Sequence, residues 1–402
     1  MPRRASALVA HLRCRGLALA VASAMVALAP RPALAQAPAG PPSEETPAKP
    51  AEPAEKPGST SAPSELESLK SALDGIREGL GLSGFFDVRA ADSRTDPNVF
   101  SMGDFELDLA RAFGRHVQVG AAIVVNDEGA ALAVGFVDIH MFGGLVAPRG
   151  RLPVEKGFHV QLGRFDVPFG NDWRYFAAKD RTELAAPLTT EAVMDGGYND
   201  VGLRVLGNTG SLDYSAYWLR GEGKGTLVGG RLAFSPFDNP YRLHGRVRAL
   251  ELGVSALHDF DGDGGTGATA FAVDSELRGK LGHLRAEFLR RDQRPVEGRD
   301  DGLIRSGWHV TATLDAGAPA GIPMTPYARY DTVKEEPSST PEPSVEGTGD
   351  RTERLSAGVN ASLFEVLSVK LEYQRTLSAP PSVEAEEDFH WDSWLAQVVV
   401  SF

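Results

Sequence analysis

The chain has 402 residues, with 41 Lys and Arg against 54 Asp and Glu, which gives a formal net charge of −13. A chain this acidic is a poor partner for nucleic acid. Its single cysteine, Cys14, lies ahead of an apolar stretch, so the sequence beyond that stretch offers no disulfide and no cysteine-ligated metal site.

Residues 1–35 have the pattern of a secretory signal peptide. Four arginines precede the apolar stretch 17–28, and Ala33-Leu34-Ala35 forms a small-residue cleavage site. Removing this segment takes away five of the 41 basic residues and no acidic ones, so 36 basic residues face 54 acidic ones and the net charge becomes −18. The rest of the sequence has no uninterrupted apolar run of about 18 residues, so we predict no helical membrane anchor.

Two segments follow before the main domain. Residues 36–63 are rich in Pro, Ala, Ser and Glu without apolar periodicity, which predicts a disordered linker in the periplasm. Residues 64–80 place leucines and one isoleucine at heptad spacing, which predicts a short coiled-coil-like helix. Gly75 and Gly79 weaken this helix, so it is more stable where several copies associate.

Residues 82–402 alternate apolar and polar side chains over many short segments. Asp104–Leu109 alternates strictly, and the last strand places Trp394, Val398 and Phe402 on one face. We predict an all-β fold, a transmembrane antiparallel barrel of about 16 strands, most of them near the roughly 9–11 residues that a tilted strand needs. The predicted strands are 82–91, 100–112, 117–126, 131–142, 157–166, 200–207, 211–220, 227–234, 247–259, 268–280, 283–292, 303–314, 325–333, 352–362, 367–377 and 391–402. Near Ala249-Leu250 the alternation of apolar and polar side chains shifts by one residue, which predicts a bulge or a miscounted hairpin. A secreted soluble β-sandwich is the alternative fold.

The connections support an even number of strands, because short turns and longer loops alternate. Tight turns at 114–116, 280–282 and 364–366 are predicted on the inner side, and longer loops on the outer side. The connections 143–156 and 235–246 are long for inner turns.

If the apolar faces of the strands meet lipid, the opposite faces line a lumen. These faces carry both signs of charge, which predicts a hydrated interior and not an apolar cavity; a solvated sheet face without selectivity is the alternative. The predicted pore-lining residues are Arg89, Glu106, Asp108, Arg204, Glu276, Arg278, Arg285, Glu287, Arg305, Lys370 and Glu372.

The longest connection is the third outer loop, residues 167–199. Its length and charge predict a loop that folds into the bore and forms a constriction, with an external mobile loop as the alternative. The predicted constriction residues are Asp172, Arg174, Lys179, Asp180, Arg181 and Glu183.

The stretch Gly163-Arg164-Phe165-Asp166-Val167-Pro168-Phe169-Gly170 resembles the Gly-basic-Phe-x-x-Pro-Phe-Gly motif of the phosphate-selective porin O and P family. The heptad segment and the terminal Phe402 are also similar to that family. The resemblance implies a sixteen-stranded trimeric channel, a loop folded into the bore, and recognition of the terminal strand by the outer-membrane assembly machinery. The family lines its bore with arginines and lysines, whereas this lumen mixes acids with arginines, so we expect weak or cation-leaning selectivity.

An acidic segment, Asp259-Phe260-Asp261-Gly262-Asp263-Gly264, matches the opening of a calcium loop. The closing acid is missing, because Ala270 stands at the twelfth position. A Ca²⁺ ion held by Asp259, Asp261 and Asp263 beside lipopolysaccharide is one reading, and a solvated acidic loop is the other.

No catalytic motif is recognisable, and the nine histidines are not expected to cluster as metal ligands. We therefore expect a porin in the outer membrane of a Gram-negative-type envelope that passes small hydrophilic solutes, without a cofactor. Its expected partners are membrane lipid, lipopolysaccharide, the assembly machinery and two further copies in a homotrimer. A structural barrel that tethers envelope layers with a plugged bore is the first alternative, and a lipase-type barrel enzyme is the second.

Overall fold

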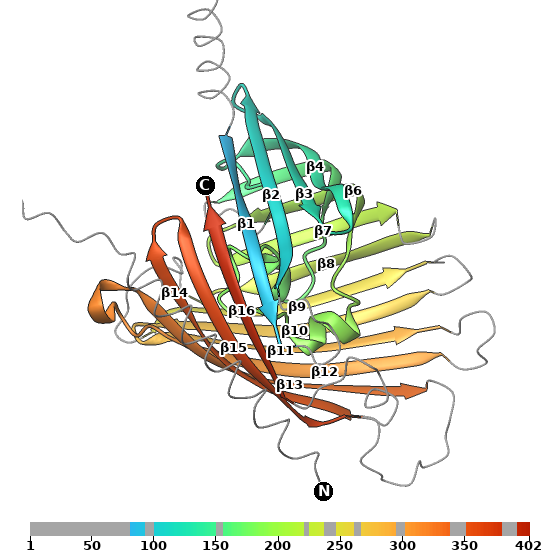
Figure 1. Cartoon of the computed structure of the whole chain (residues 1–402). Coiled ribbons are helices and arrows are strands. Elements are labelled where there is room, and N and C mark those ends of the chain that lie inside the picture. The colour runs from blue at the N-terminus through green and yellow to red at the C-terminus, as the bar shows by residue number, and fades with distance from the viewer. Residues whose placement is uncertain are drawn as a thin grey trace, which may run out of the picture. The chain divides into compact units, whose positions relative to one another are not determined.

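The computed structural model describes residues 81–92, 100–149, 156–220, 225–236, 247–260, 267–294, 302–337, 351–379 and 392–402, all within one compact unit, Ala72–Phe402. Sixteen strands make up this described part (Figure 1). They are β1 (Gly81–Ala91), β2 (Phe100–Phe113), β3 (Val117–Asn126), β4 (Gly129–Phe142), β5 (Gly157–Asp166), β6 (Asn199–Asn208), β7 (Leu212–Arg220), β8 (Thr226–Phe234), β9 (Val247–Asp259), β10 (Ala268–Gly279), β11 (Gly282–Gln293), β12 (Leu303–Leu314), β13 (Met324–Pro337), β14 (Arg351–Phe364), β15 (Leu367–Ser378) and β16 (Asp392–Ser401).

The sheet is a closed barrel. Each strand pairs antiparallel with its neighbours in sequence, and β1 pairs with β16, so no strand edge is left open. The predicted all-β barrel of sixteen antiparallel strands is therefore confirmed, and the strand ends differ from the predicted ones by four residues at most, at the outer end of β13.

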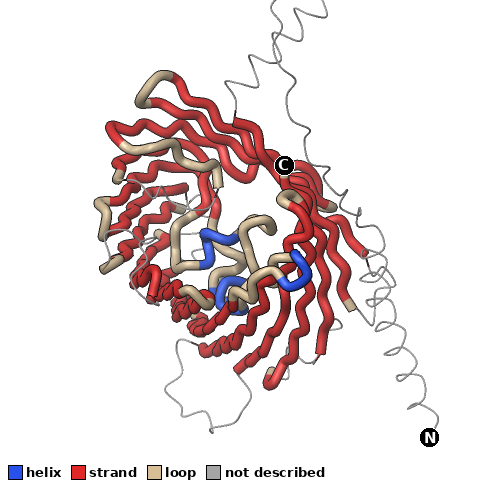
Figure 2. Tube along the Cα trace, turned by 90° about the vertical axis from the view of Figure 1, so that its left-hand side faces the viewer, coloured by secondary structure: helices blue, strands red, loops and turns tan. Residues whose placement is uncertain are grey.

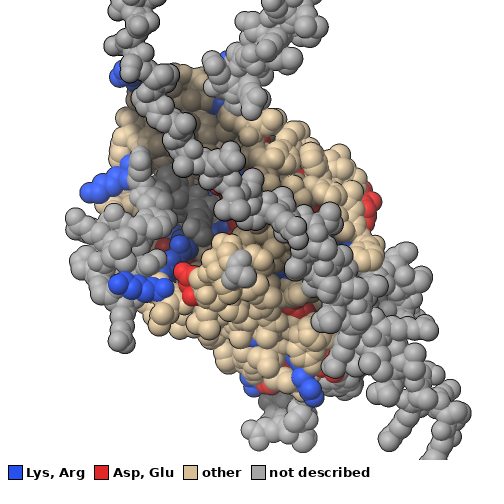
Figure 3. Space-filling view, turned by 60° about the vertical axis from the view of Figure 1, so that its left-hand side comes forward, with Lys and Arg blue, Asp and Glu red and all other residues tan. Residues whose placement is uncertain are grey.

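Strand β10 shows why this sequence forms a barrel with its apolar side outward. Phe271 and Val273 are 44% and 43% exposed, whereas the alternate residues Asp274 and Glu276 are 2% and 5% exposed. Successive side chains of a strand point to opposite faces, so the exposed face is apolar and the buried face is charged. This is the reverse of a water-soluble sheet and suits a wall in contact with lipid. Figure 3 shows a mostly uncharged surface with Lys, Arg, Asp and Glu mainly at its margins and in a recess.

The seam between β1 and β16 closes the barrel. Phe85 pairs with Ser401 and Val88 with Val398, in a continuous antiparallel register. Beyond the seam, the backbone of Phe402 accepts a hydrogen bond from Gly84 N at 3.0 Å and donates one to Gly84 O at 3.1 Å. The Phe402 ring stacks on Phe105 of β2, with 6.2 Å between centroids. The terminal aromatic thus spans β1 and contacts the next strand.

The expected irregularity in β9 is a bulge. The register with β10 shifts between the pairs Arg278↔Ala249 and Gly279↔Val247. Arg248 of β9 is therefore left unpaired in this register, directly before Ala249-Leu250, where the apolar alternation shifts. An extra residue of this kind moves the following side chains to the other face.

Four predicted features lie outside the described residues: the signal peptide 1–35, the linker 36–63, the helix 64–80, and most of the connection 235–246. Among the described residues, no helix has the length and apolar character that crossing a membrane requires.

The connection after β4 is long for an inner turn, and its described part, residues 143–149, enters the barrel. Val146 is 4% exposed, and its backbone exchanges hydrogen bonds with the Gln118 amide at 2.9 and 2.6 Å. Arg149 then forms ion pairs with Glu106 and, at 2.9 Å, with Asp166. Residues 143–149 are thus bonded to the inner wall of the barrel.

Candidate functional site

The segment between β5 and β6, residues 167–198, is called the long loop below. It contains a 3₁₀ turn, Asp172–Tyr175, and a short π-helix, Thr189–Val193. Figure 2 shows these two elements inside the ring of strands. The backbone N–H of Val167 donates to Tyr198 O at 2.9 Å, which closes the neck of the loop where it leaves the two strands.

Two glycines of the Gly163–Gly170 motif set the path of the loop. Gly163 has φ +137° and packs so tightly on β4 that an added Cβ would lie 2.2 Å from Gly135 O. Gly170 has φ +65°, the left-handed region that favours glycine, and turns the chain against Glu287 of β11. The motif is therefore a structural turn at the start of the long loop.

One wall of the barrel holds the start of the loop. Arg231 Nε of β8 donates to Gly170 O at 2.8 Å, and Gly170 N donates to Ser255 Oγ of β9 at 3.1 Å. Arg174 forms an ion pair with Glu251 of β9 at 2.7 Å. Asn171 N donates to the Glu287 carboxylate.

The opposite wall holds the middle of the loop. Lys370 Nζ of β15 donates to Ala178 O at 2.6 Å and to Arg181 O at 2.7 Å. The Glu372 carboxylate accepts from Leu184 N at 3.0 Å. Contacts of this kind, hydrogen bonds or ion pairs, join the long loop to β2 and to each strand from β8 to β15; the strand residues are Asp108, Arg231, Glu251, Ser255, Glu276, Arg285, Glu287, Arg291, Arg305, His309, Tyr327, Arg329, Asp331, Arg354, Lys370 and Glu372.

Under the loop, part of the inner wall is apolar. Phe169 and Val193 of the loop belong to one buried cluster with Leu227 of β8, Leu257 of β9 and Leu289 of β11. The predicted hydrated interior therefore does not include this part of the inner wall. These inward positions are apolar because the long loop, and not water, covers them.

Most of the predicted pore-lining residues are buried. Eight have 6% exposure or less: Glu106, Asp108, Arg204, Glu276, Arg285, Glu287, Lys370 and Glu372. The side chains of Arg278, Arg305 and Arg89 are 28%, 25% and 45% exposed. Arg89 Nε contacts the fully buried Asp87 at 2.8 Å, so its head group lies along the inner face near the outer end of β1.

The predicted constriction residues differ in their surroundings. Asp172 and Arg181 form an ion pair at 2.8 Å within the loop. Lys179 pairs with Asp108, Arg174 with Glu251, and Glu183 with Arg285, so these three link the loop to the wall. Asp180 is exposed.

The electrostatics of these pairs are strong because water is excluded. Burial alone raises the pKa of a carboxyl group, but the Arg285 guanidinium outweighs burial and lowers the pKa of Glu183 to about 2. For Arg174, burial alone lowers the pKa, and the nearby Glu251 and Glu276 outweigh it and raise the pKa above its ordinary value. Both loop side chains are therefore charged at neutral pH.

Several inward-facing charged residues are absent from the predicted set. Asp274 lies two residues before Glu276 on the same face of β10, and Asp331 lies two residues after Arg329 on β13. The two-residue alternation identifies such positions in the sequence. Arg149 carries no such signal, because it lies in a connection.

Of the predicted calcium ligands, Asp259 is 6% exposed at the end of β9. Asp261 and Asp263 lie outside the described residues. The calcium site stays a prediction.

Two histidines do cluster, against expectation. His140 and His159 offer ligand atoms within 4.8 Å of a carboxylate oxygen of Asp138. The three residues lie on β4 and β5, and only strand pairing brings them together.

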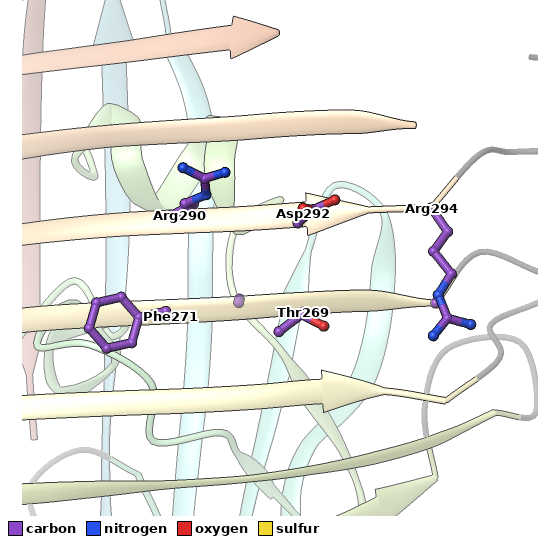
Figure 4. Close-up of a pocket in the computed structure, with 7 residues that line it drawn as sticks. Thr269, Phe271, Arg290, Asp292 and Arg294 are labelled. Carbon is purple, nitrogen blue, oxygen red and sulfur yellow. The ribbon is translucent and has the colours of Figure 1, made fainter. Parts of the chain in front are cut away.

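A pocket of about 470 Å³ lies at the outer ends of β10 and β11 (Figure 4). It is lined by Gly267, Thr269, Ala270, Phe271, Arg290, Asp292 and Arg294. The side chains of Thr269, Phe271, Arg290 and Asp292 alternate along the strands with the buried Ala270 and Arg291. The pocket therefore lies on the outer wall of the barrel and is separate from the lumen.

No family model and no curated protein sequence matches the chain. Solved structures do match it. An anion-selective porin from Comamonas acidovorans is 11% identical, with a TM-score of 0.54, over 80% of this chain and 99% of that one. OmpF of Salmonella typhi, in complex with daunomycin, is 12% identical with a TM-score of 0.55, over 80% and 97%.

OmpT, an outer membrane protein of Vibrio cholerae solved in a trimer form, is 10% identical with a TM-score of 0.55, over 80% of this chain and 99% of that one. At these identities the likeness concerns the fold. The chain therefore has the sixteen-stranded barrel fold of outer-membrane porins.

Proposed function

We propose that the protein is a passive outer-membrane channel whose bore is narrowed by the long loop. One observation carries this proposal: the long loop is bonded to both walls of a closed sixteen-stranded barrel. A barrel of about sixteen strands is wide enough to leave an aqueous channel. A loop held across it reduces the cross-section, so small hydrophilic solutes pass and larger ones are excluded. No cofactor or conformational cycle is required.

The pairing of charges favours weak ion selectivity. Arg231 contacts Asp274 at 2.6 Å, Arg329 contacts Asp331 at 2.9 Å, and Arg174 contacts Glu251 at 2.7 Å. A guanidinium held this close to a carboxylate presents little net positive charge to a passing anion. The motif at the loop entry supports the resemblance to the phosphate-selective porin O and P family, but these pairs argue against phosphate preference.

Planar-bilayer recording of the refolded chain tests the channel and its selectivity. We expect stepwise conductance, and a reversal potential in a KCl gradient that is small or of the sign for cations. Liposomes containing the protein are expected to swell with small sugars and not with large ones. A strongly anion-selective reversal potential would show that the selectivity proposal is wrong.

A loop variant tests the role of the long loop. Replacing residues 176–187 by a short Gly-Ser linker removes the contacts with β2 and β15 and those of Arg329 and Tyr327 of β13, and we expect a larger single-channel conductance. Replacing residues 339–350, in the loop between β13 and β14, is the matched control and is expected to leave the conductance unchanged. Equal conductance of the two variants would contradict the constriction.

The structural barrel with a plugged bore has one observation in its favour. Residues 143–149 enter the lumen besides the long loop, and Arg149 bridges Glu106 and Asp166 there. This alternative predicts neither conductance nor sugar entry, so the same two measurements distinguish it.

The proposed partners follow from the same geometry. Arg290 and Arg294 at the outer wall pocket suit phosphate groups of lipopolysaccharide. The β1–β16 seam with Phe402 suits recognition by the assembly machinery. The trimer form of the similar Vibrio cholerae protein supports a homotrimer, which three equal current steps per insertion would reveal.

A further inference from the structure

The histidine–aspartate cluster lies on two paired strands of the barrel. Asp138 and His140 are two residues apart on β4 and therefore share a face. His159 on β5 is directly opposite His140 in the register, and Gln161 is opposite Asp138. Strand pairing thus places the three side chains together on the inner face of the barrel.

The geometry of the cluster is compact. Asp138 Oδ2 lies 3.0 Å from His140 Nδ1 and 3.0 Å from His159 Nδ1. The two imidazole rings are 5.4 Å apart at their centroids. Asp138 and His159 have no exposed surface and His140 is 5% exposed. The Nδ1 atoms of His140 and His159 therefore both point to the same oxygen of the buried Asp138 carboxylate.

Two buried polar atoms of the cluster have no hydrogen-bond partner in the described part of the chain. These are Asp138 Oδ1 and His159 Nε2. The ion-pair partners of Asp138 among the described residues are the two histidines. Arg204 of β6 interacts with Asp138 electrostatically from beyond ion-pair distance and is bonded to Gln161 and to Asp166 O. A buried carboxylate is costly unless a cation pairs with it directly.

The surroundings fix the orientation of His159. Gly143 and Gly157 lie behind its ring, so that a Cβ added to them would come within 3.0 and 2.8 Å of Nε2. This backbone packing leaves Nδ1 as the nitrogen that faces Asp138. Gly143 has φ +110°, so the close approach depends on glycine there.

We propose that Asp138, His140 and His159 form a binding site for a divalent transition metal of the zinc class. Two imidazole nitrogens and one carboxylate oxygen are ligands that zinc favours, whereas calcium and magnesium favour oxygen alone. The cation would coordinate Nδ1 of both rings and the Asp138 carboxylate, and each ring would then carry its proton at Nε2. Three protein ligands leave a fourth coordination position for water.

An exposed histidine marks the approach to the site. His116, in the turn between β2 and β3, has its ring centroid 6.3 Å from that of His140, and its Nδ1 lies 3.0 Å from His140 O. His116, His140 and His159 therefore form a row from the exposed turn into the buried cluster. A metal ion can pass along such a row by ligand exchange.

Calorimetric titration of Zn²⁺ into the folded barrel, prepared without a polyhistidine tag, tests the site. We expect one saturable site per chain. Asp138→Asn and His159→Gln should each weaken binding by more than about tenfold, since even loss of a residue that only orients a ligand costs that much. His258→Gln is the matched control, because His258 is exposed on β9 and bonds Thr269, and its affinity should equal that of the unmodified chain.

Each variant is first compared with the unmodified barrel for its shift in electrophoretic mobility on heating, which reports folding. Co²⁺ provides a second readout on the unmodified chain, since a tetrahedral nitrogen and oxygen site gives intense visible absorption. Absence of saturable Zn²⁺ binding, a Co²⁺ spectrum of the octahedral aqueous ion, or equal affinity in folded Asp138→Asn would each overturn the proposal. A purely structural hydrogen-bonded triad would give these results.

Discussion

Lys370 illustrates how individual cations are used inside this barrel. Its side chain is 1% exposed, and its ammonium group donates to two carbonyl oxygens of the long loop, Ala178 O and Arg181 O. Arg204 likewise donates to Asp166 O at 3.0 Å, at the start of the loop. Both residues were predicted to line the pore, but their charges serve to hold backbone in place.

Glu183 gives a prediction on pH dependence. Its pKa falls from 4.5 unfolded to about 2 folded, so the Glu183–Arg285 pair stabilises the folded state above pH 4.5. This contribution, about 3 kcal/mol, is lost as pH falls from 4.5 through 2. We expect Glu183→Gln to lower the free energy of unfolding at pH 7 and to flatten its decline between pH 4.5 and 2, as measured by urea unfolding in detergent.

The control for this experiment is Glu336→Gln. Glu336 pairs with Lys334 near the outer end of β13, where both side chains are about half exposed. Exposed pairs contribute at most about 1 kcal/mol, so this variant should follow the unmodified chain at all pH values. If the free energy of unfolding declines equally below pH 4.5 in the unmodified chain, Glu183→Gln and Glu336→Gln, the role assigned to Glu183 is refuted.

Among the structural elements, the turn at Gly170 decides where the long loop goes. The turn needs φ +65°, and it passes so close to β11 that a Cβ would meet the Glu287 carboxylate at 2.6 Å. The same carboxylate accepts a hydrogen bond from Asn171 N. A side chain at position 170 therefore disturbs both the backbone and its anchor.

We expect Gly170→Ala to destabilise the barrel more than Gly196→Ala. Gly196 has φ +83° with no atom near its added Cβ, so alanine there incurs only the backbone strain of about 1 kcal/mol. Gly170→Ala also displaces Glu287, which adds about 1–3 kcal/mol for the disrupted hydrogen bond. Thermal unfolding followed by circular dichroism measures the stability of both variants. Equal losses of stability in Gly170→Ala and Gly196→Ala would mean that the contact with Glu287 is unimportant.

Across the whole molecule, closure of the barrel depends on the seam between its first and last strands. Phe402→Ala removes the ring that stacks on Phe105 and lies against Gly84. We expect it to lower the free energy of unfolding by about 1 kcal/mol more than Phe364→Ala, because aromatic pairs add about 0.5–1.5 kcal/mol beyond area burial. Phe364 is 57% exposed on β14 and is the matched control. Urea unfolding in lipid vesicles measures both variants, and a smaller loss for Phe402→Ala would contradict this role.

The sequence predicts the strands well because a two-residue period is a local signal. The bounds of β5, β9 and β12 agree with the predicted ones at both ends. The contacts of the long loop have no local signal, since Lys370 and Ala178 are nearly 200 residues apart and meet only when the sheet closes. The same holds for His140 and His159, whose proximity requires the register of β4 with β5.

The apolar wall beneath the long loop has a mechanical consequence. If the long loop moved away from the wall, Leu227, Leu257 and Leu289 would be exposed to water. The ion pairs of Arg174 with Glu251 and of Glu183 with Arg285 would break at the same time. The barrel therefore resists opening by displacement of this segment. We therefore expect applied voltage to change the width of the proposed channel far less than substitutions in the long loop do.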